Sequence, residues 1–306
     1  MKQLFLPSGL ILAVITGFIL PSGGIFVSDN SGLKIIVFLI FLVSGYQTGA
    51  KEFSFERKLF ILFLVAASIS LFLAPLLGLF VSKILHFPLH LAMGLIIIST
   101  VPPTISSGVV ITEVSRGNAT LALFLTISLN LLGIFSMPFV LDFCLKAAGP
   151  IDIDQMALLC KMLFFVLLPF IIGKSLRSIS GKTNVSPVWS YLNSSCVIII
   201  VYASISTSIS ALTKLGVMDY LTIFTGVASI HILLLCINAY AGKLLKLPSA
   251  DQKAMLFVCS QKTMALAIAV LASIKFDTGN AIIVCLMFHF FQLFFDSFLA
   301  AAIHKR

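Results

Sequence analysis

Two polar runs interrupt long apolar stretches of this chain, and they hold the side chains best suited to bind an ion or a small polar ligand. The first run, Ser99 to Gly108, combines Pro102 and Pro103 with several serine and threonine hydroxyls. Proline has no backbone N–H and disfavours helix before it, so this run predicts an unwound segment with free carbonyl groups. Such groups suit a small cation or a polar substrate. A simple kink, whose hydroxyls bond to their own helix, is the alternative.

The second run, Cys259 to Thr263, places Lys262 well inside an apolar stretch. A lysine at the centre of a membrane costs about 2.5–3.5 kcal/mol, so Lys262 should face an aqueous cavity or a partner. In a structural role it would pair with Asp296 or Glu113. In a functional role it would bind an anion, replace a bound cation or exchange a proton, and we favour this role.

Polar residues in two further apolar stretches share helical faces. Thr126 and Asn130 are four residues apart, and so are Gln292 and Asp296, with His289 one turn earlier. A buried acid in the last stretch predicts either a site for the coupling ion or the counter-ion of the buried lysine. These pairs are the second group of candidate ligands.

Other residues carry weaker signals. His231 and Lys161 are expected near span ends, as interfacial anchors. Gly45 to Gly49 matches the GxxxG packing pattern. The six cysteines are scattered singly, so we expect small buried hydrophobes rather than disulfides or metal ligands. No phosphate-binding loop, zinc-protease motif or hydrolase triad is present, so ATP-driven transport and hydrolysis have no support.

The composition indicates what kind of protein must position these residues. The chain of 306 residues is 59% hydrophobic and 10% charged, whereas a soluble domain carries about 25% charged residues. So few charged residues could not cover the surface of a water-exposed globule. The sequence therefore predicts an all-α polytopic membrane protein. The formal net charge of +9 is then a signal of membrane topology, and no nucleic-acid partner is expected.

A bilayer core of about 30 Å needs roughly 20 apolar residues per helix, and on this scale the chain divides into ten spans. The N-terminal run is taken as the first span rather than a removable signal. The spans lie near Leu4–Leu20, Leu33–Gly49, Leu59–Val81, Leu89–Val114, Ala119–Leu145, Met156–Ile172, Trp189–Ile209, Tyr220–Leu244, Gln252–Ile274 and Ala281–Ile303.

The lysines and arginines orient these spans. With ten spans both termini lie on one side, and most of the 20 basic residues fall in loops on that side. Basic residues in short loops mark the cytoplasmic side. We therefore expect a multi-pass protein of the cell membrane, inner or plasma membrane, with both termini in the cytoplasm.

The two halves of the chain also resemble one another. Arg116-Gly117-Asn118 follows the first polar run and Thr278-Gly279-Asn280 follows the second, while Asn130 and Gln292 each come twelve residues after their turn. Five spans per half is an odd number, so the second copy must be inverted, as in many secondary transporters. The predicted repeats are residues 1–149 and 150–306 of one integrated transmembrane domain.

With these motifs, the chain resembles the bile acid:sodium symporter superfamily, and within it the SBF-like branch. The resemblance implies two inverted five-helix repeats, a core and a panel domain, and unwound fourth and ninth spans that cross near the substrate and ion sites. The matching segments are Val101 to Val110, Arg116 to Asn118, Leu131 to Gly133 with Pro138, Cys259 to Thr263, and Gln292 to Phe298.

The departures from the family pattern concern its two sodium sites. Family members use a Ser-Asn pair, and Gly108 and Val109 stand at those positions here. The glutamate of their second element is Phe257 here, and the asparagine is Lys262. Losing a carboxylate and gaining an ammonium opposes sodium binding, because like charges 4 Å apart repel by about 4 kcal/mol at an effective dielectric of 20.

We therefore expect Lys262 to stand where one sodium ion would sit. Transport would be uniport, or proton-linked if the dry surroundings favour the neutral amine. No cofactor is expected beyond a coupling sodium ion or proton, and any sodium would lie near Thr126 and Gln261, which keep the family pattern. The candidate binding residues are Thr104, Ser106, Ser107, Thr126, Asn130, Ser260, Gln261, Lys262, Thr263, Gln292 and Asp296.

The leading prediction is a secondary active transporter in the lipid bilayer that moves a small organic anion by alternating access. A membrane regulator or scaffold in calcium or glycan homeostasis, without transport, is the alternative that the same branch suggests. An intramembrane enzyme would have Asp296 and His289 as its acid–base pair, and we expect no enzyme.

Overall fold

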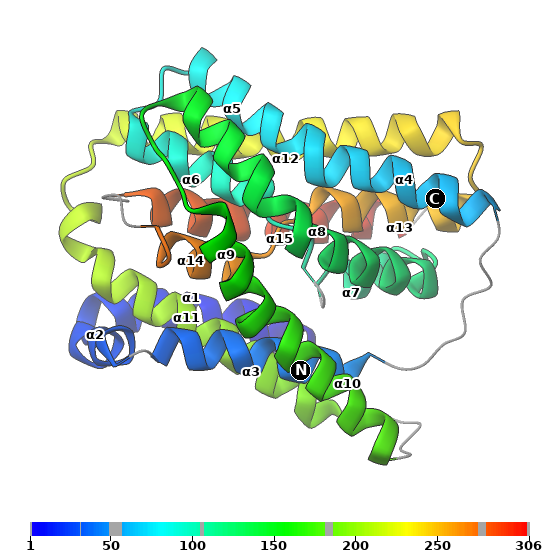
Figure 1. The fold of residues 1–306 in the computed structure, drawn as a ribbon, viewed down its shortest axis with the longest axis horizontal. Coiled ribbons are helices and arrows are strands. Elements are labelled where there is room, and N and C mark those ends of the chain that lie inside the picture. Colours follow the sequence, from blue (N-terminus) through cyan, green and yellow to red (C-terminus); the bar gives the residue numbers. More distant parts are fainter. Residues whose placement is uncertain are drawn as a thin grey trace. The chain divides into compact units, whose positions relative to one another are not determined.

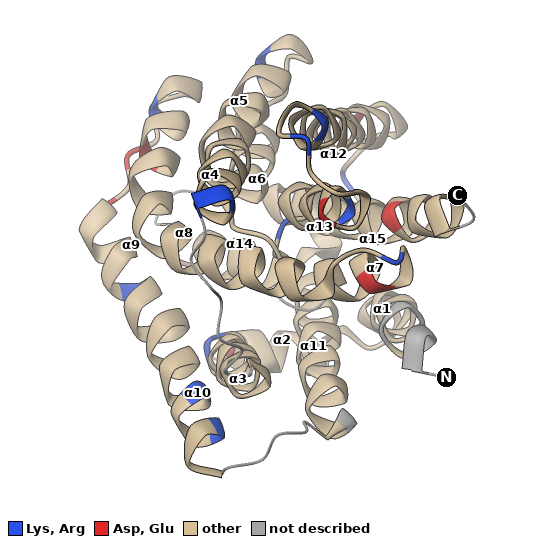
Figure 2. Ribbon diagram, turned by 90° about the vertical axis from the view of Figure 1, so that its right-hand side faces the viewer, with Lys and Arg blue, Asp and Glu red and all other residues tan. Residues whose placement is uncertain are grey.

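A computed structural model of the chain shows helices joined by short turns (Figure 1). No strand occurs in the part of the chain that it describes, so the all-α prediction is confirmed there. Few charged residues lie along the ribbons in Figure 2, as the composition requires. The described residues are 2–30, 32–48, 57–104, 107–180, 186–274 and 280–304.

Seven helical segments within the described ranges are long and apolar enough to cross a membrane, which makes the chain a multi-pass membrane protein. Each of the ten predicted spans coincides with helix, but α3 (Gly32–Gln47) and α6 (Leu89–Thr100) are short. At 1.5 Å per residue, the 12 residues of α6 span only about 18 Å of a core of about 30 Å. Length and apolarity alone therefore do not give ten complete spans.

The sequence did not predict the helix α2 (Pro21–Asp29). It follows α1 (Lys2–Ile19) after a bend of 97°, and the two helices together would count as an eighth span. Pro21 occupies the start of α2, where its missing N–H leaves no helical hydrogen bond unmade. The proline thus permits the chain to begin a new helix in a new direction.

The helices form two compact units, and each unit takes segments from both halves of the chain. The first unit comprises Met1–Glu52 and Ala157–Leu215. Within it α3 packs along α10 (Leu168–Ser180), while α1 and α2 pack along α11 (Pro187–Leu212). Besides α1, α2 and α3, it contains most of α9 (Gln155–Met162), a π-helical turn (Leu163–Leu167), α10 (Leu168–Ser180) and α11 (Pro187–Leu212).

The second unit comprises Phe53–Met156 and Gly216–Arg306. Its interior is α6, whose residues from Leu91 to Thr100 are all buried among α5, α8 and α15. Its elements are α4 (Arg57–Ala67), a π-helical turn (Ser68–Leu73), α5 (Ala74–Ile84), α6, α7 (Ser107–Val114), α8 (Ala119–Ala148), α12 (Val217–Leu244), α13 (Ser249–Ser260), α14 (Met264–Leu271) and α15 (Ala281–His304).

Both predicted interruptions are present in this second unit. The helix α6 ends at Thr100, and Val101–Thr104 is not helical before α7 begins at Ser107. The helix α13 ends at Ser260, and α14 begins at Met264. We call these segments, residues 101–104 and 261–263, the first and second breaks. Ser106, a predicted binding residue, lies outside the described residues.

The GxxxG pattern marks one close helix contact inside the first unit. A Cβ atom on Gly45 would clash with the backbone carbonyl of Phe170 in α10, and one on Gly173 would clash with the carbonyl of Leu42. The two helices can approach this closely only because both positions lack a side chain. Gly49, the second glycine of the pattern, lies outside the described residues.

We expect Gly45→Leu to destabilise the first unit by about 1–3 kcal/mol, because the added side chain must push α3 away from α10. Thermal unfolding of the detergent-solubilised protein measures the effect. Gly216→Ala is the matched control, since a Cβ there meets nothing closer than an Asp219 oxygen at 3.6 Å. A melting temperature of Gly45→Leu equal to that of the control would show that the contact is not tight.

Candidate functional site

The two breaks meet inside the second unit. The backbone N–H of Thr263 donates to the carbonyl oxygen of Pro102, 3.1 Å away. Pro102 and Pro103 supply no N–H of their own, so the unwound chain there offers mainly carbonyl groups. The breaks that the sequence predicted separately are thus a single crossing of unwound backbone.

An amide side chain from the second helix after each break holds that break. At the first break, Asn130 Nδ2 of α8 donates to Pro103 O at 2.9 Å and to Thr126 O at 2.8 Å. At the second, Gln292 of α15 takes the N–H of Lys262 on Oε1 and donates from Nε2 to its carbonyl, both at 2.8 Å. Asn130 and Gln292 therefore bond to the protein's own backbone in the described state.

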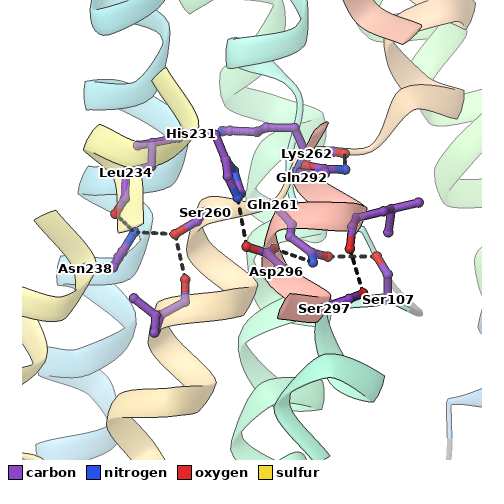
Figure 3. Close-up of polar contacts among 12 residues, drawn as sticks. Ser107, His231, Leu234, Asn238, Ser260, Gln261, Lys262, Gln292, Asp296 and Ser297 are labelled. Atoms are coloured by element: carbon purple, nitrogen blue, oxygen red, sulfur yellow. Dashed lines mark hydrogen bonds and ion pairs between the residues drawn. The ribbon is translucent and has the colours of Figure 1, made fainter. Parts of the chain in front are cut away.

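Gln261 links the second break to the first (Figure 3). Its Oε1 lies 2.7 Å from Ser107 Oγ and 3.0 Å from Thr104 Oγ1, and the two hydroxyl oxygens are also in contact with each other. Each hydroxyl has one proton to donate, so at most two of these three contacts are hydrogen bonds at one time. Its Nε2 donates to Asp296 Oδ2 at 2.7 Å. Three of the predicted binding residues thus form one cluster of oxygen atoms, which we call the oxygen cluster: Thr104 Oγ1, Ser107 Oγ and Gln261 Oε1.

Asp296 also contacts a histidine that the sequence analysis misplaced. His231 Nε2 lies 2.8 Å from Asp296 Oδ1, and both side chains are fully buried. The prediction of His231 as an interfacial anchor is wrong, because it lies at the middle of α12 rather than near an end. A lone histidine at the centre of a long apolar helix was the signal that could have identified it.

Lys262 is fully buried, and its partner is a backbone carbonyl. Nζ donates to Ser70 O at 2.6 Å, with Ser70 Oγ at 3.5 Å. The alternative pairing with Asp296 or Glu113 is not found, because Asp296 binds His231 and Gln261 while Glu113 is exposed. Among the residues that the structure describes, no carboxylate oxygen lies within 4.0 Å of Nζ.

The carbonyl that receives Lys262 is free because of a π-helical turn and a proline. Within Ser68–Leu73 the N–H of Ala74 bonds back to Ile69 O instead of Ser70 O. The next residue that could serve Ser70 O is Pro75, which has no N–H. Neither Ser70 nor Pro75 was predicted as part of the site, although the position of Pro75 inside a long apolar run was a signal that could have identified it.

Several candidate hydroxyls bond to their own helix. Thr126 Oγ1 donates to Ala122 O at 2.8 Å, and Ser260 Oγ donates to Leu256 O at 2.6 Å. Ser99 and Thr100 make the same bond to the fourth residue before them, as the kink alternative predicted. Thr104 and Ser107 instead bond across the crossing, so only part of the first polar run behaves as a kink.

Two further residues sit around this crossing. Asn238 of α12 was not predicted; its Nδ2 donates to Leu234 O at 2.8 Å and lies 3.4 Å from Ser260 Oγ. His289 Nδ1 lies 3.1 Å from Gln292 Nε2, as the predicted shared face of α15 requires.

The cysteines are all free, but Cys160 and Cys236 are exposed, which corrects the expectation that all six are buried. The described part of the chain contains no group of three His, Cys, Asp or Glu side chains that could hold a metal ion.

Comparison with known proteins gives the family. The family model described as "SBF-like CPA transporter family" matches residues 4–305. The chain belongs to this transporter family. The resemblance found in the sequence motifs is thereby confirmed, and the family is one of transporters rather than enzymes.

Three relatives cover nearly the whole chain. The "Probable sodium/metabolite cotransporter BASS4, chloroplastic" of Arabidopsis thaliana is 29% identical, covering 96% of this chain and 71% of its own. The protein of that name in Oryza sativa subsp. indica is 28% identical, with 96% and 74% covered. The "Uncharacterized protein PA2026" of Pseudomonas aeruginosa is 24% identical, with 99% and 94% covered. The transporter family therefore spans the whole described fold.

We expect Gln292→Leu to destabilise the second unit, because the N–H and carbonyl of Lys262 would both lose their partner. Each buried unpaired group costs about 1–3 kcal/mol. The free energy of unfolding in SDS titrations measures the loss. Gln252→Leu is the control, since Gln252 also bonds a backbone carbonyl, Leu247 O, but is only partly buried. An equal loss of unfolding free energy for both variants would contradict the conclusion that Gln292 stabilises the second break.

We expect Pro75→Ala to give Ser70 O a helical donor and so weaken its bond to Lys262. The effects of Pro75→Ala and Lys262→Met on unfolding should then be non-additive, by about 0.5–3 kcal/mol. A double-mutant cycle measures this coupling. Pro138→Ala combined with Lys262→Met is the control, because Pro138 lies inside α8 and makes no bond to Lys262. Additive effects in both cycles would show that Pro75 does not free the carbonyl.

Proposed function

We propose that the protein is a secondary active transporter that moves a small organic anion across the bilayer by alternating access. The family and the names of the plant relatives support transport of a metabolite. The crossing of two unwound segments supports a binding site at this point, because unwound backbone at membrane depth persists only inside protein or beside a wet cavity. The binding residues that we propose are the side chains at this crossing, among them Thr104, Gln261 and Lys262.

The ten-span architecture of two inverted five-helix repeats is part of this proposal. Local geometry of the second unit supports it. His86 and Lys246, 160 residues apart, both have φ of 50°, and each is followed two residues later by a proline that caps the next helix, Pro88 at α6 and Pro248 at α13. Each of those helices then ends at a break. Such a repeated departure from regular backbone favours a duplicated unit.

The coupling part of the proposal rests on Lys262. The Lys262 side chain occupies the kind of place that a bound cation would take. It is buried, it lies at the second break, and it donates to a carbonyl oxygen that has no helical donor. Freed carbonyls are the ligands with which broken helices bind sodium in transporters. We therefore propose that Lys262 replaces one sodium ion, and that transport is uniport or proton-linked.

An organic anion is the proposed substrate because the crossing holds a buried amine and several N–H and O–H donors. A carboxylate could accept from hydroxyls such as Thr104 and Ser107, and a protonated Lys262 would attract it. Steroid acids and smaller carboxylates both fit this chemistry.

The orientation of the spans is proposed from the basic residues. Lys243, Lys246 and Lys253 lie around the turn between α12 and α13, on the side predicted for both termini. Short loops rich in lysine and arginine remain in the cytoplasm. We place both termini there, in a protein of the cell membrane.

We expect replacement of sodium by choline to leave uptake into proteoliposomes unchanged, because Lys262 already fills the cation position. The labelled substrate is the carboxylate that most raises the melting temperature in a screen from steroid acids to small keto acids. Strict dependence of uptake on sodium would contradict the replacement of sodium by Lys262. Absence of uptake for every carboxylate would contradict the carrier itself.

Lys262→Ala should abolish uptake or make it sodium-dependent, since the position of the ammonium becomes empty. Lys161→Ala is the matched control, because Lys161 lies in an apolar segment of the first unit but is exposed. The same uptake assay, with sodium and with choline, compares the two. Equal behaviour of both variants would refute the role of Lys262.

A further inference from the structure

A continuous hydrogen-bonded chain leads from α12 to the first break. It runs from His231 Nε2 to Asp296 Oδ1, from Asp296 Oδ2 to Gln261 Nε2, and from Gln261 Oε1 to the hydroxyl of Ser107 (Figure 3). The hydroxyl of Thr104 also lies 3.0 Å from Gln261 Oε1. His231, Asp296 and Gln261 have no exposed surface. These three members of the chain are therefore restricted to the partners that the protein supplies.

The donors and acceptors of this chain define where its protons are. His231 Nδ1 is buried with no partner, so a proton on that nitrogen would be an unpaired buried donor. The neutral imidazole with its proton on Nε2 is therefore favoured, and it donates to Asp296 Oδ1. Gln261 Nε2 can only donate, so it must face an oxygen that carries no proton. Both contacts fit an ionised Asp296.

The free position for an incoming proton is Asp296 Oδ2, because Oδ1 already accepts from the histidine. A proton on Oδ2 would face the N–H of Gln261, and two donors cannot share this contact. The contact is restored when the Gln261 amide turns over and presents Oε1 to the new O–H. Its N–H groups then point toward Thr104 and Ser107, whose hydroxyls can rotate to accept them.

We propose that Asp296, supported by His231, is the proton-binding site of this protein, and that its protonation reverses the Gln261 side-chain amide. The oxygen cluster then loses the carbonyl oxygen of Gln261 and gains an N–H donor. Oxygen acceptors suit a cation, whereas N–H donors suit a carboxylate. Proton binding thus prepares the crossing for an anion and couples the two as a symport, which rests on the carrier function proposed above.

Among the titratable side chains near this hydrogen-bonded chain, Asp296 is the one that we expect to take up the proton. His231 is the titratable side chain that bonds it from α12, and Lys262 is committed to Ser70 O. His289, two turns earlier on α15, bonds Gln292. The other Asp, Glu, Lys and His side chains in the described part of the packed elements lie toward helix ends: Asp219 and Lys243 of α12, Asp251 and Lys253 of α13, Glu113 of α7, His90 of α6 and His304 of α15. The same helices also carry thiols and phenols: Tyr220, Cys236 and Tyr240 of α12, Cys259 of α13 and Cys285 of α15. Within the described residues, α14 carries none.

Infrared difference spectra of the reconstituted protein test the site without any substrate. Between about pH 8 and about pH 6, where exposed carboxyls stay ionised, the wild-type protein should gain the carbonyl band of one protonated acid. Asp296→Asn should lack this band, while Asp142→Asn should keep it, because Asp142 is the other buried aspartate of the second unit within the described residues. A band that is absent from the wild type, or present in Asp296→Asn, would overturn the proposal.

Gln261→Leu tests the reversal of the amide. In the wild-type protein the new Asp296 O–H donates to Gln261 Oε1, and this bond lowers the frequency of the acid carbonyl band. Loss of the acceptor in Gln261→Leu should therefore raise the frequency, and a band at the wild-type position would overturn the reversal. Protein that elutes as one symmetric peak in detergent and keeps its helical circular dichroism shows that the variant is folded.

Uptake in proteoliposomes then connects the site to transport. Wild-type uptake of cholate or lactate, as a large and a small carboxylate, should fall by about tenfold per pH unit once the site is mostly deprotonated. Asp296→Asn should lose this dependence, and Asp142→Asn should keep it. A wild-type pH profile in Asp296→Asn would overturn the proposal. No uptake by the wild type at any pH would contradict the carrier function, while the infrared result would still decide the proton site.

Discussion

The structure of the second unit depends on one constraint: backbone polar groups that leave a helix inside a membrane must find partners within the protein. Two breaks free such groups at the crossing, and the chain satisfies them with side-chain amides and with each other. Asn130 bonds the carbonyl of Pro103, Gln292 bonds both backbone groups of Lys262, and Thr263 bonds Pro102. The crossing is therefore a polar centre whose backbone groups are bound by buried side chains and by each other.

The same constraint explains why the charges lie where they do. A π-helical turn and Pro75 leave the carbonyl of Ser70 without a helical donor, and the ammonium of Lys262 takes that place. Asp296 satisfies the amide of Gln261 and the ring of His231 at once. In each case a buried ionisable side chain bonds to a buried polar group that has no other partner for that hydrogen bond. Lys262 lies at the second break, and Asp296 bonds to that break through Gln261.

Local features of the sequence predicted the elements well, while the partners of the buried charges were predicted poorly. Prolines and clustered hydroxyls located both breaks, and the i, i+4 spacing placed Thr126 with Asn130 and Gln292 with Asp296. The assignment of His231 to a membrane interface failed although the predicted span, Tyr220–Leu244, was close to the bounds of α12. That span already placed His231 near its middle, so the error lay in the interpretation of the histidine as an anchor and not in the span boundary. The pairing of Lys262 with an acid was a reasonable expectation from charge, and a backbone carbonyl took its place.

By itself the sequence determined the class of protein, the positions of most helices, the two interruptions and the membership of a transporter family, because each depends on composition or on neighbours along the chain. Only the tertiary structure decided which groups meet. Lys262 and its carbonyl partner are 192 residues apart, and His231 and Asp296 are 65 apart. Several buried groups could satisfy each charge, and the choice among them follows from how the helices pack, which no local pattern records.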